Sequence, residues 1–268
     1  MTTTYDDVPL LKKPVWTWEV PVYLFVGGAA GGAAVIGAIA EWTRTDGTLA
    51  RDARWIAAAG GPVSAALLTA DLGRPERFYN MLRVFKPESA MSIGSWTLTA
   101  FSGATTATLV PALSRPAAAA SAALGTVMLT YTGVLIGATA IPVWNENIRL
   151  LPVHFAASGI ASAAALLTLA GHDEEALNDI AIAAAAVETV IGGAIEARDA
   201  PALEPLKHGG TGWMIRAGGV LSGPVPLLVR AATRSPAWRR AASVAALAGS
   251  LLTRIGWIAA GRVSAQRS

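Results

Sequence analysis

The chain has 268 residues, of which 53% are hydrophobic and only 15% are charged, and its mean hydropathy is +0.46. A soluble domain would be about one quarter charged, so this composition argues against a water-soluble protein and predicts an all-α, polytopic membrane protein. The net charge of +3 is modest and fits basic residues at membrane boundaries, so we expect no nucleic-acid partner. Without cysteine, the chain itself offers no disulfide, no thiolate ligand for an iron–sulfur cluster and no c-type haem attachment.

In chain order, residues 1–19 are expected to form an N-terminal interfacial segment. They lack the short apolar core and cleavage site of a signal peptide, so the first span is expected to be retained. Eight later segments are long and apolar enough to cross a bilayer. They are residues 20–41, 55–71, 93–113, 117–140, 151–170, 176–197, 212–232 and 239–261. The sequence therefore predicts an eight-helix membrane domain over residues 20–261, in two four-helix bundles, and a C-terminal tail at 262–268.

Proline positions predict two local features of these spans. Only Ser114, Arg115 and Pro116 separate the third and fourth, which predicts a tight antiparallel hairpin, and Pro224 with its neighbours predicts a kink in the seventh. Eight spans place both termini on one side. Lys and Arg are too evenly divided between the two faces to orient the chain.

The segment between the second and third spans, DLGRPERFYNMLRVFKPESAMSIGSW (71–96), is dense in charge although it lies between apolar stretches. It falls on the same expected face as residues 16–23, 141–155 and 196–213. This face is more elaborate than the opposite one. The pattern predicts a shaped surface that meets a partner or a substrate.

Three blocks point to a family. They are WTWEVPVYLFVGGAAGGA (16–33), the block 71–96 and YTGVLIGATAIPVWNENIRLLPVHFAASG (131–159). Over about residues 14–200 the chain resembles the NrfD/polysulfide reductase membrane subunit family.

The resemblance implies an eight-helix, multi-pass anchor of the bacterial inner (cytoplasmic) membrane, with no haem or iron–sulfur cluster of its own. Such a subunit binds a quinone, menaquinone or ubiquinone. It exchanges electrons with a docked ferredoxin-like [4Fe–4S] subunit, which is itself bound to a catalytic subunit of the molybdopterin type. The protein would then be part of an oxidoreductase and not catalytic alone.

The histidines agree with this expectation. Only His154, His172 and His208 exist, and the last two fall in loops on opposite faces, so no pair could hold a haem inside the bilayer. Electrons must then enter and leave near one face.

Tyr131 is the leading candidate to donate a hydrogen bond to a quinone. It lies in the fourth span, about 13 Å below the elaborated face at 1.5 Å per residue, and its YTGxL block matches the family's quinone-site tyrosine. Gly133 and Gly137 would let a flat ring approach. The alternative is a buried tyrosine bonded to the backbone of a neighbouring helix.

Glu19 stands where some family members have a histidine and an asparagine that contact the quinone. This sequence has neither there, so Glu19 is the candidate proton acceptor, and the alternative is an exposed carboxylate at a helix N-terminus. The remaining candidates for the quinone site are Trp18, Tyr23, Asp71 and His154. For His154 a capping or core role is the alternative.

Partner docking is expected on the loops of the elaborated face. The candidate docking residues are Arg74, Arg77, Arg83, Lys86, Trp144 and Asn145. For Asp71, Arg74 and Arg77 the alternative is an ion-pair network that fixes the loop.

Three charges, Glu188, Arg216 and Arg254, fall inside predicted spans, where charge must be paired. Glu188 could pair with either arginine. Alternatively, these three residues with Glu196 form a proton path.

The sequence favours a quinone-binding anchor. Two rivals stay open: a proton- or ion-translocating subunit or transporter, and a purely structural anchor.

Overall fold

The computed structural model describes residues 11–43 and 47–267, and within these ranges every regular element is a helix. The all-α prediction is confirmed. In chain order the elements are α1 (Glu19–Thr43), α2 (Gly47–Ala70), the 3₁₀ helix η2 (Pro75–Leu82), α3 (Ala90–Ala107), α4 (Ser114–Gly137), α5 (Pro142–Asn145), α6 (Leu150–Leu169), α7 (Glu175–Ala197), η3 (Pro201–Leu203), α8 (Glu204–Lys207), α9 (Gly209–Ser222), α10 (Pro224–Ala232) and α11 (Pro236–Gln266).

Five helices in the described ranges are long and apolar enough to cross a membrane: α1, α4, α6, α7 and α11. A sixth is added if α2 and η2, which meet at 114°, count as one bent span. The predicted third and seventh spans correspond to α3 and to the pair α9 and α10, which do not meet this criterion. Length and hydropathy therefore support five or six spans, and the predicted number of eight is not confirmed.

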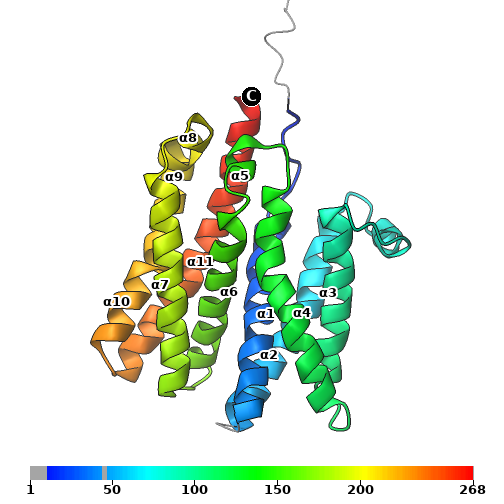
Figure 1. Cartoon of the computed structure of the whole chain (residues 1–268), viewed down its shortest axis with the longest axis vertical. Coiled ribbons are helices and arrows are strands. Elements are labelled where there is room, and N and C mark those ends of the chain that lie inside the picture. The colour runs from blue at the N-terminus through cyan, green and yellow to red at the C-terminus, as the bar shows by residue number, and fades with distance from the viewer. Residues whose placement is uncertain (1–10, 44–46, 268) are drawn as a thin grey trace, which may run out of the picture.

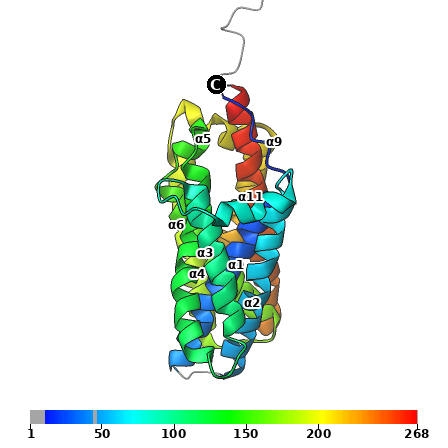
Figure 2. The same ribbon diagram turned by 90° about the vertical axis from the view of Figure 1, so that its right-hand side faces the viewer.

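The long helices run along one axis and form two packed groups (Figure 1). In the first group α1 and α3 each pack on α2 and α4, and in the second α6 and α9 each pack on α7 and α11. The groups meet where α1 packs on α6 and α11 and where α4 packs on α6. Figure 2 shows that the molecule is narrow when viewed at right angles to this row.

Small residues allow these close approaches. A Cβ added at Gly31 would lie 2.8 Å from the carbonyl oxygen of Gly125 on α4, and one added at Gly32 would lie 2.8 Å from that of Gly159 on α6. Helix packing in membranes relies on such small side chains. The glycine stripe of α1 is therefore a packing surface for both groups.

Several boundaries differ from expectation. The third and fourth spans do form an antiparallel hairpin, α3 with α4, but its turn lies at residues 108–113 and not at 114–116, because α3 ends at Ala107 and α4 already begins at Ser114. Pro111 lies in the intervening turn, and Pro116 fits the first turn of α4, where its missing N–H costs nothing. The expected tail is also shorter, since α11 continues to Gln266, and residues 1–10 of the expected interfacial segment lie outside the described residues.

The kink in the seventh span is a break. α9 ends at Ser222 and α10 begins at Pro224, with Gly223 between them at φ −100° and ψ −92°. Proline offers no N–H to the preceding turn and its ring crowds that turn, which favours a break at this point.

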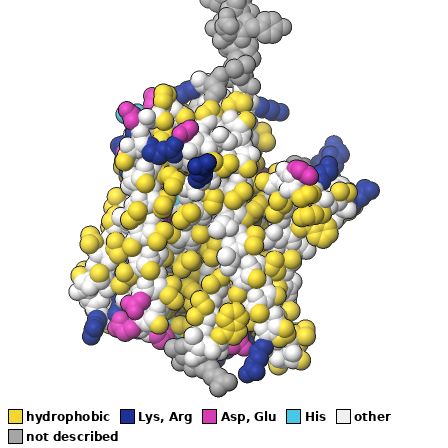
Figure 3. Space-filling model, viewed as in Figure 1, with side chains coloured by type: hydrophobic (Ala, Val, Ile, Leu, Met, Phe, Trp, Pro, Cys, Tyr) yellow, Lys and Arg dark blue, Asp and Glu magenta, His cyan; other side chains and the backbone are white. Residues whose placement is uncertain are grey.

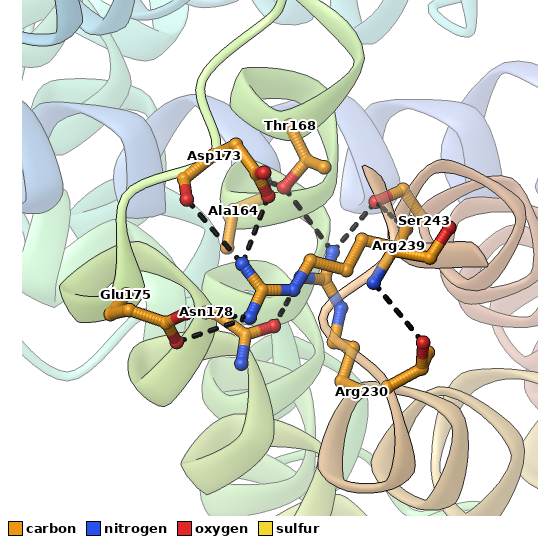
Figure 4. A network of polar contacts seen from close by, with 10 residues as sticks. Ala164, Thr168, Asp173, Glu175, Asn178, Arg230, Arg239 and Ser243 are labelled. Carbon is orange, nitrogen blue, oxygen red and sulfur yellow. Dashed lines mark hydrogen bonds and ion pairs between the residues drawn. The ribbon is translucent and has the colours of Figure 1, made fainter. Parts of the chain in front are cut away.

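At the far end of the second group, two buried arginines fasten α10 and α11 to α6 and α7 (Figure 4). Arg239 forms ion pairs with Asp173 (2.9 Å) and Glu175 (3.0 Å). Arg230 donates to Asn178 (3.2 Å), Thr168 (3.3 Å) and Ser243 (2.6 Å). This end of the group is therefore held by side-chain bonds as well as by packing.

At the opposite end, three tryptophans join distant parts of the sequence. Trp144, which is fully buried, stacks on Trp16 with ring centroids 5.2 Å apart and donates its Nε1–H to the carbonyl of Trp257 (2.8 Å). Arg262 also donates to the carbonyl of Trp16. Residues 11–18 and the end of α11 therefore lie at the same end of the molecule, as Figure 1 shows.

Candidate functional site

Three of the predicted quinone-site residues line one cavity. Tyr23, Asp71 and Tyr131 come from α1, the end of α2 and α4. The cavity has a volume of about 50 Å³, and its other lining residues are Trp16, Val20, Leu68, Leu72, Met81, Met91, Ser95 and Leu135. We call it the Tyr131 cavity; it lies at the end of the first group, where residues 71–91 connect α2 to α3.

Tyr131 is buried, and its hydroxyl donates to the carbonyl of Ala90 at 2.8 Å. The alternative considered for it, a bond to the backbone of a neighbouring helix, is therefore what the structure shows. The ring lies against Gly94, where an added Cβ would be 1.9 Å from the hydroxyl oxygen. Only glycine at position 94 leaves room for this ring.

The expected role of Gly133 and Gly137 is wrong. A Cβ at Gly133 would lie 2.5 Å from the backbone of Leu151, and one at Gly137 would lie 3.0 Å from the Cα of Ile148. The backbone just before and at the start of α6 packs directly against these two glycines. They leave no space for a quinone ring.

Thr17 brings the two candidate carboxylates together. Its N–H donates to Asp71 Oδ1 at 3.0 Å, and its hydroxyl lies 2.8 Å from the same oxygen and also contacts the carboxylate of Glu19. Glu19 is thus held beside Asp71 at the rim of the Tyr131 cavity. Trp18 is 66% exposed and does not line the cavity.

His154 lines a different cavity, of about 270 Å³, in the second group of helices. We call it the Glu188 cavity, because Glu188, which is 1% exposed, forms part of its wall. Glu196 and Arg216 lie at its exposed end, where they form an ion pair of 2.6 Å. His154 therefore belongs with the candidate proton-path residues and not with Tyr131.

Glu188 does not pair with either arginine within 4.0 Å in the part of the sequence that the structure describes, so that expectation is wrong. Its Oε1 accepts a hydrogen bond from Ser222 at 2.6 Å, beside the break between α9 and α10. Arg216 is engaged by Glu196 instead.

Arg254 is fully buried at the centre of the molecule, where α11 meets α1 and α6. It donates to Ser158 (3.0 Å) and to the carbonyl of Ser250 (3.0 Å), and it lies 5.0 Å from the ring centroid of Phe155. Serines and an aromatic face replace the expected carboxylate. A continuous series of ion pairs from Glu188 through Arg254 is therefore absent among the described residues.

The docking candidates separate into two kinds. Arg74, Arg77, Arg83 and Lys86 are exposed on the lobe that residues 71–90 form beside α3, and Figure 3 shows basic side chains at its outer edge and hydrophobic ones beneath. The alternative network of Asp71, Arg74 and Arg77 is absent from the described ion pairs.

The other two docking candidates lie on or beside α5. Asn145 is exposed. Trp144 is fully buried between Trp16 and Trp257, so its expected docking role is wrong.

Sequence reasoning missed the residues that shape these sites. Gly94 and Met81 both lie within the segment 71–96, but neither has a predicted role. Ser158 and Ser162 share one face of α6, as do Ser250 and Arg254 on α11, and Ser250 lies within 3.0 Å of both serine hydroxyls. Polar side chains at i, i+4 spacing in apolar spans are the signal that could have found this centre.

Comparisons with known proteins agree with the resemblance. The family model described as polysulfide reductase (NrfD_2) matches residues 1–266. The C subunit of polysulfide reductase from Wolinella succinogenes is 27% identical over 193 residues, which cover 60% of this protein and 60% of that relative. The sequence thus spans less than two thirds of the relative's length. With a family match over nearly its whole sequence and helices suited to crossing a membrane, the protein belongs to the NrfD/polysulfide reductase family of membrane subunits.

Proposed function

We propose that this protein is the quinone-binding membrane anchor of a multisubunit oxidoreductase. The observation that carries the proposal is the convergence of Tyr23, Asp71 and Tyr131 on one cavity, with Glu19 held at its rim. A quinone site needs a hydrogen-bond donor, a proton route to water and an apolar wall. Tyr131 supplies the donor, the Glu19 and Asp71 pair supplies the route, and leucines and methionines supply the wall.

Binding requires the Tyr131 cavity to widen. A cavity of about 150 Å³ holds a benzene ring, whereas this one has about 50 Å³. Met81 and Met91 are the lining residues that most readily move, because methionine is flexible. Met81 lies in η2, which has no buried residue, and Met91, in the first turn of α3, is 51% exposed. Tyr131 can then turn its hydroxyl from Ala90 to a quinone oxygen, since the Ala90 carbonyl keeps its ordinary helical partner.

The electron partner is proposed to be a ferredoxin-like [4Fe–4S] subunit that joins this protein to a catalytic subunit. The name of the Wolinella relative, one lettered subunit of a reductase, supports membership of a multisubunit complex. The exposed residue Asn145 and the cations of residues 74–86 are the proposed landing surface. If Arg74, Arg77 and Lys86 are all changed to glutamate and the iron–sulfur subunit still co-purifies in full, these cations are not part of it.

All eight predicted segments are proposed to cross the bacterial inner membrane. At 1.5 Å per residue, the 18 residues of α3 extend about 27 Å, close to the hydrocarbon thickness of about 30 Å. The sequence has no cysteine, so single cysteines introduced in successive turns would map the topology by labelling from each side. If cysteines in two consecutive connecting loops are labelled from the same side, the segment between those loops does not cross the membrane.

Quinone binding is tested on the intact complex with Tyr131→Phe and Glu19→Gln. In Tyr131→Phe, loss of the phenolic hydroxyl should lower quinone-dependent turnover by at least tenfold, since one hydrogen bond to the reacting ring is worth about 1.4 kcal/mol or more. Competition by a quinone analogue should weaken in parallel. Unchanged turnover and unchanged competition in both variants would show that Tyr131 and Glu19 do not contact the quinone. If the complex binds no quinone analogue and turnover is unchanged in both variants, the protein is a structural anchor.

One observation favours a second candidate function, ion translocation. Glu188 lies beside a broken helix inside the bundle, an arrangement that transporters use at their ion sites. This function predicts that Glu188→Gln slows proton uptake into proteoliposomes during turnover. Equal proton uptake by the variant and the wild type would contradict a role of Glu188 in ion translocation.

A further inference from the structure

The Glu188 cavity has the size of a binding site for a ring. Its volume of about 270 Å³ exceeds the roughly 150 Å³ that holds benzene. Most of its wall is apolar, from residues on α7, α8, α9 and α11 and from η3. These are Ile195, Leu203, Leu206, Ile215, Val220 and Trp257.

Three buried polar atoms on this wall have no hydrogen-bond partner in the described structure. They are Glu188 Oε2, His154 Nδ1 and Thr253 Oγ1, in side chains that are 1%, 4% and 2% exposed. Buried polar groups in native proteins are nearly always satisfied, so each of these atoms calls for a partner. A few polar groups that converge in an apolar cavity are typical of a small-molecule site.

The cavity opens between α7 and α9. A Cβ added at Gly192, Gly193 or Gly219 would have no atom within 4 Å, and Val220 beside them is 51% exposed. Gly192 and Gly193 lie in the last two turns of α7 and face outward, so a ligand can enter here from the hydrocarbon phase around a membrane-spanning α7. The charges at the far end, Glu196 and Arg216, already satisfy each other at 2.6 Å.

We propose that the Glu188 cavity binds a lipid-soluble ligand of the hydroquinone class, a six-membered ring with hydroxyl groups and an apolar tail. Its hydroxyls would donate to Glu188 Oε2 and His154 Nδ1, and Thr253 would bond the second oxygen. A bound cation such as Ca²⁺ would need about six to eight oxygen ligands, whereas the unsatisfied atoms on this wall are two oxygens and one nitrogen. A water could bond these three atoms, but it fills only about 30 Å³ of a cavity of about 270 Å³ whose remaining wall is mostly apolar. The site shares no lining residue with the Tyr131 cavity and does not depend on it.

The experiment uses the purified complex in nanodiscs and an azido-substituted short-chain benzoquinone as a photoaffinity probe, with labelled peptides mapped by mass spectrometry. The wild type should be labelled within residues 186–222. In Gly219→Leu, whose side chain fills the cavity, this labelling should fall at least tenfold. Gly103→Leu is the matched control, because a Cβ at this glycine of α3 also meets nothing within 4 Å and it lies outside both cavities.

A polar variant gives a second readout. In Glu188→Gln the amide oxygen can keep the Ser222 bond while the amide nitrogen can no longer accept a hydroxyl. Protection from labelling by the unlabelled hydroquinone should therefore weaken at least fivefold, and protection by the oxidised quinone should change less. Thermal unfolding of each variant separates loss of binding from loss of fold.

Equal labelling of residues 186–222 in the wild type and Gly219→Leu would overturn the proposal. It would also be overturned if labelling appeared only around Tyr131, a result that leaves the proposed function standing. Labelling of residues 186–222 alone would support this site and remove the assignment at Tyr131. Slower proton uptake in Glu188→Gln with no labelling at 186–222 would identify the cavity as an ion path and overturn the proposal.

Discussion

The Tyr131 cavity and the Glu188 cavity differ both in their volume and in how far their polar groups are hydrogen-bonded. The Tyr131 cavity has about 50 Å³, and its main polar groups are satisfied by Ala90 and Thr17. The Glu188 cavity has about 270 Å³ and three buried polar atoms without partners among the described residues. The first must open before it can bind a ring, whereas the second already has space and polar atoms that a ligand could satisfy.

The difference follows from what encloses each cavity. Residues 71–91, which cover the Tyr131 cavity, include a 3₁₀ helix with no buried residue. The Glu188 cavity lies between the long helices α7, α9 and α11. At one end of this group, Arg230 on α10 and Arg239 on α11 bond to side chains on or just before α7. A cover that is weakly packed opens at low cost, and rigid walls keep their space.

The largest expected effect comes from Gly94→Ala, which should break the first cavity alone. The new methyl group would lie 1.9 Å from the Tyr131 hydroxyl, so the ring must leave its position. We expect quinone-dependent turnover to fall more than tenfold and stability to fall by about 1–3 kcal/mol, the usual cost of overpacking.

Turnover and thermal unfolding of the intact complex measure these effects. Gly103→Ala on the same helix is the control, since its added methyl group meets nothing within 4 Å. Wild-type turnover in Gly94→Ala would show that the position of Tyr131 does not matter.

Ser222→Ala should act on the second cavity alone. It removes the donor 2.6 Å from Glu188 Oε1 and leaves both carboxylate oxygens without a partner among the described residues. The expected loss of stability is about 2 kcal/mol, the cost of leaving a buried acceptor unsatisfied. Thermal unfolding in detergent measures it. Ser121→Ala is the control, because this buried serine bonds only a carbonyl of its own helix, and an equal loss there would contradict the argument.

The smallest effect is expected from Trp144→Phe, which tests whether the two cavities are independent. Trp16 lines the first, Trp257 lines the second, and Trp144 contacts both. Loss of the indole hydrogen bond should cost about 1 kcal/mol. Probe labelling should then change slightly at both cavities. Trp238→Phe, at an exposed position, should change neither, and a response confined to one cavity would show that Trp144 does not couple them.

The helices were predictable because apolar length and proline positions are local properties of the sequence. The convergence of Tyr23, Asp71 and Tyr131 was anticipated through the family resemblance, and the burial of Trp144 was not. A tryptophan near a helix end fits an aromatic belt, and only the packing of α11 shows that it faces inward. The pairing of Glu188 with Ser222 in place of an arginine depends on where α9 breaks, which no local pattern fixes to one residue.

The tryptophan contact also bears on how the protein is made. Trp16 forms part of the Tyr131 cavity, yet it is held by Trp144 from the middle of the sequence and by Arg262 near its end. During synthesis the first group of helices can insert and pack early. Trp16, however, is not held in the cavity wall by Arg262 until the last helix has left the ribosome. Maturation of the proposed quinone site is therefore coupled to completion of synthesis, so a subunit truncated before α11 should reach the membrane without being able to accept electrons.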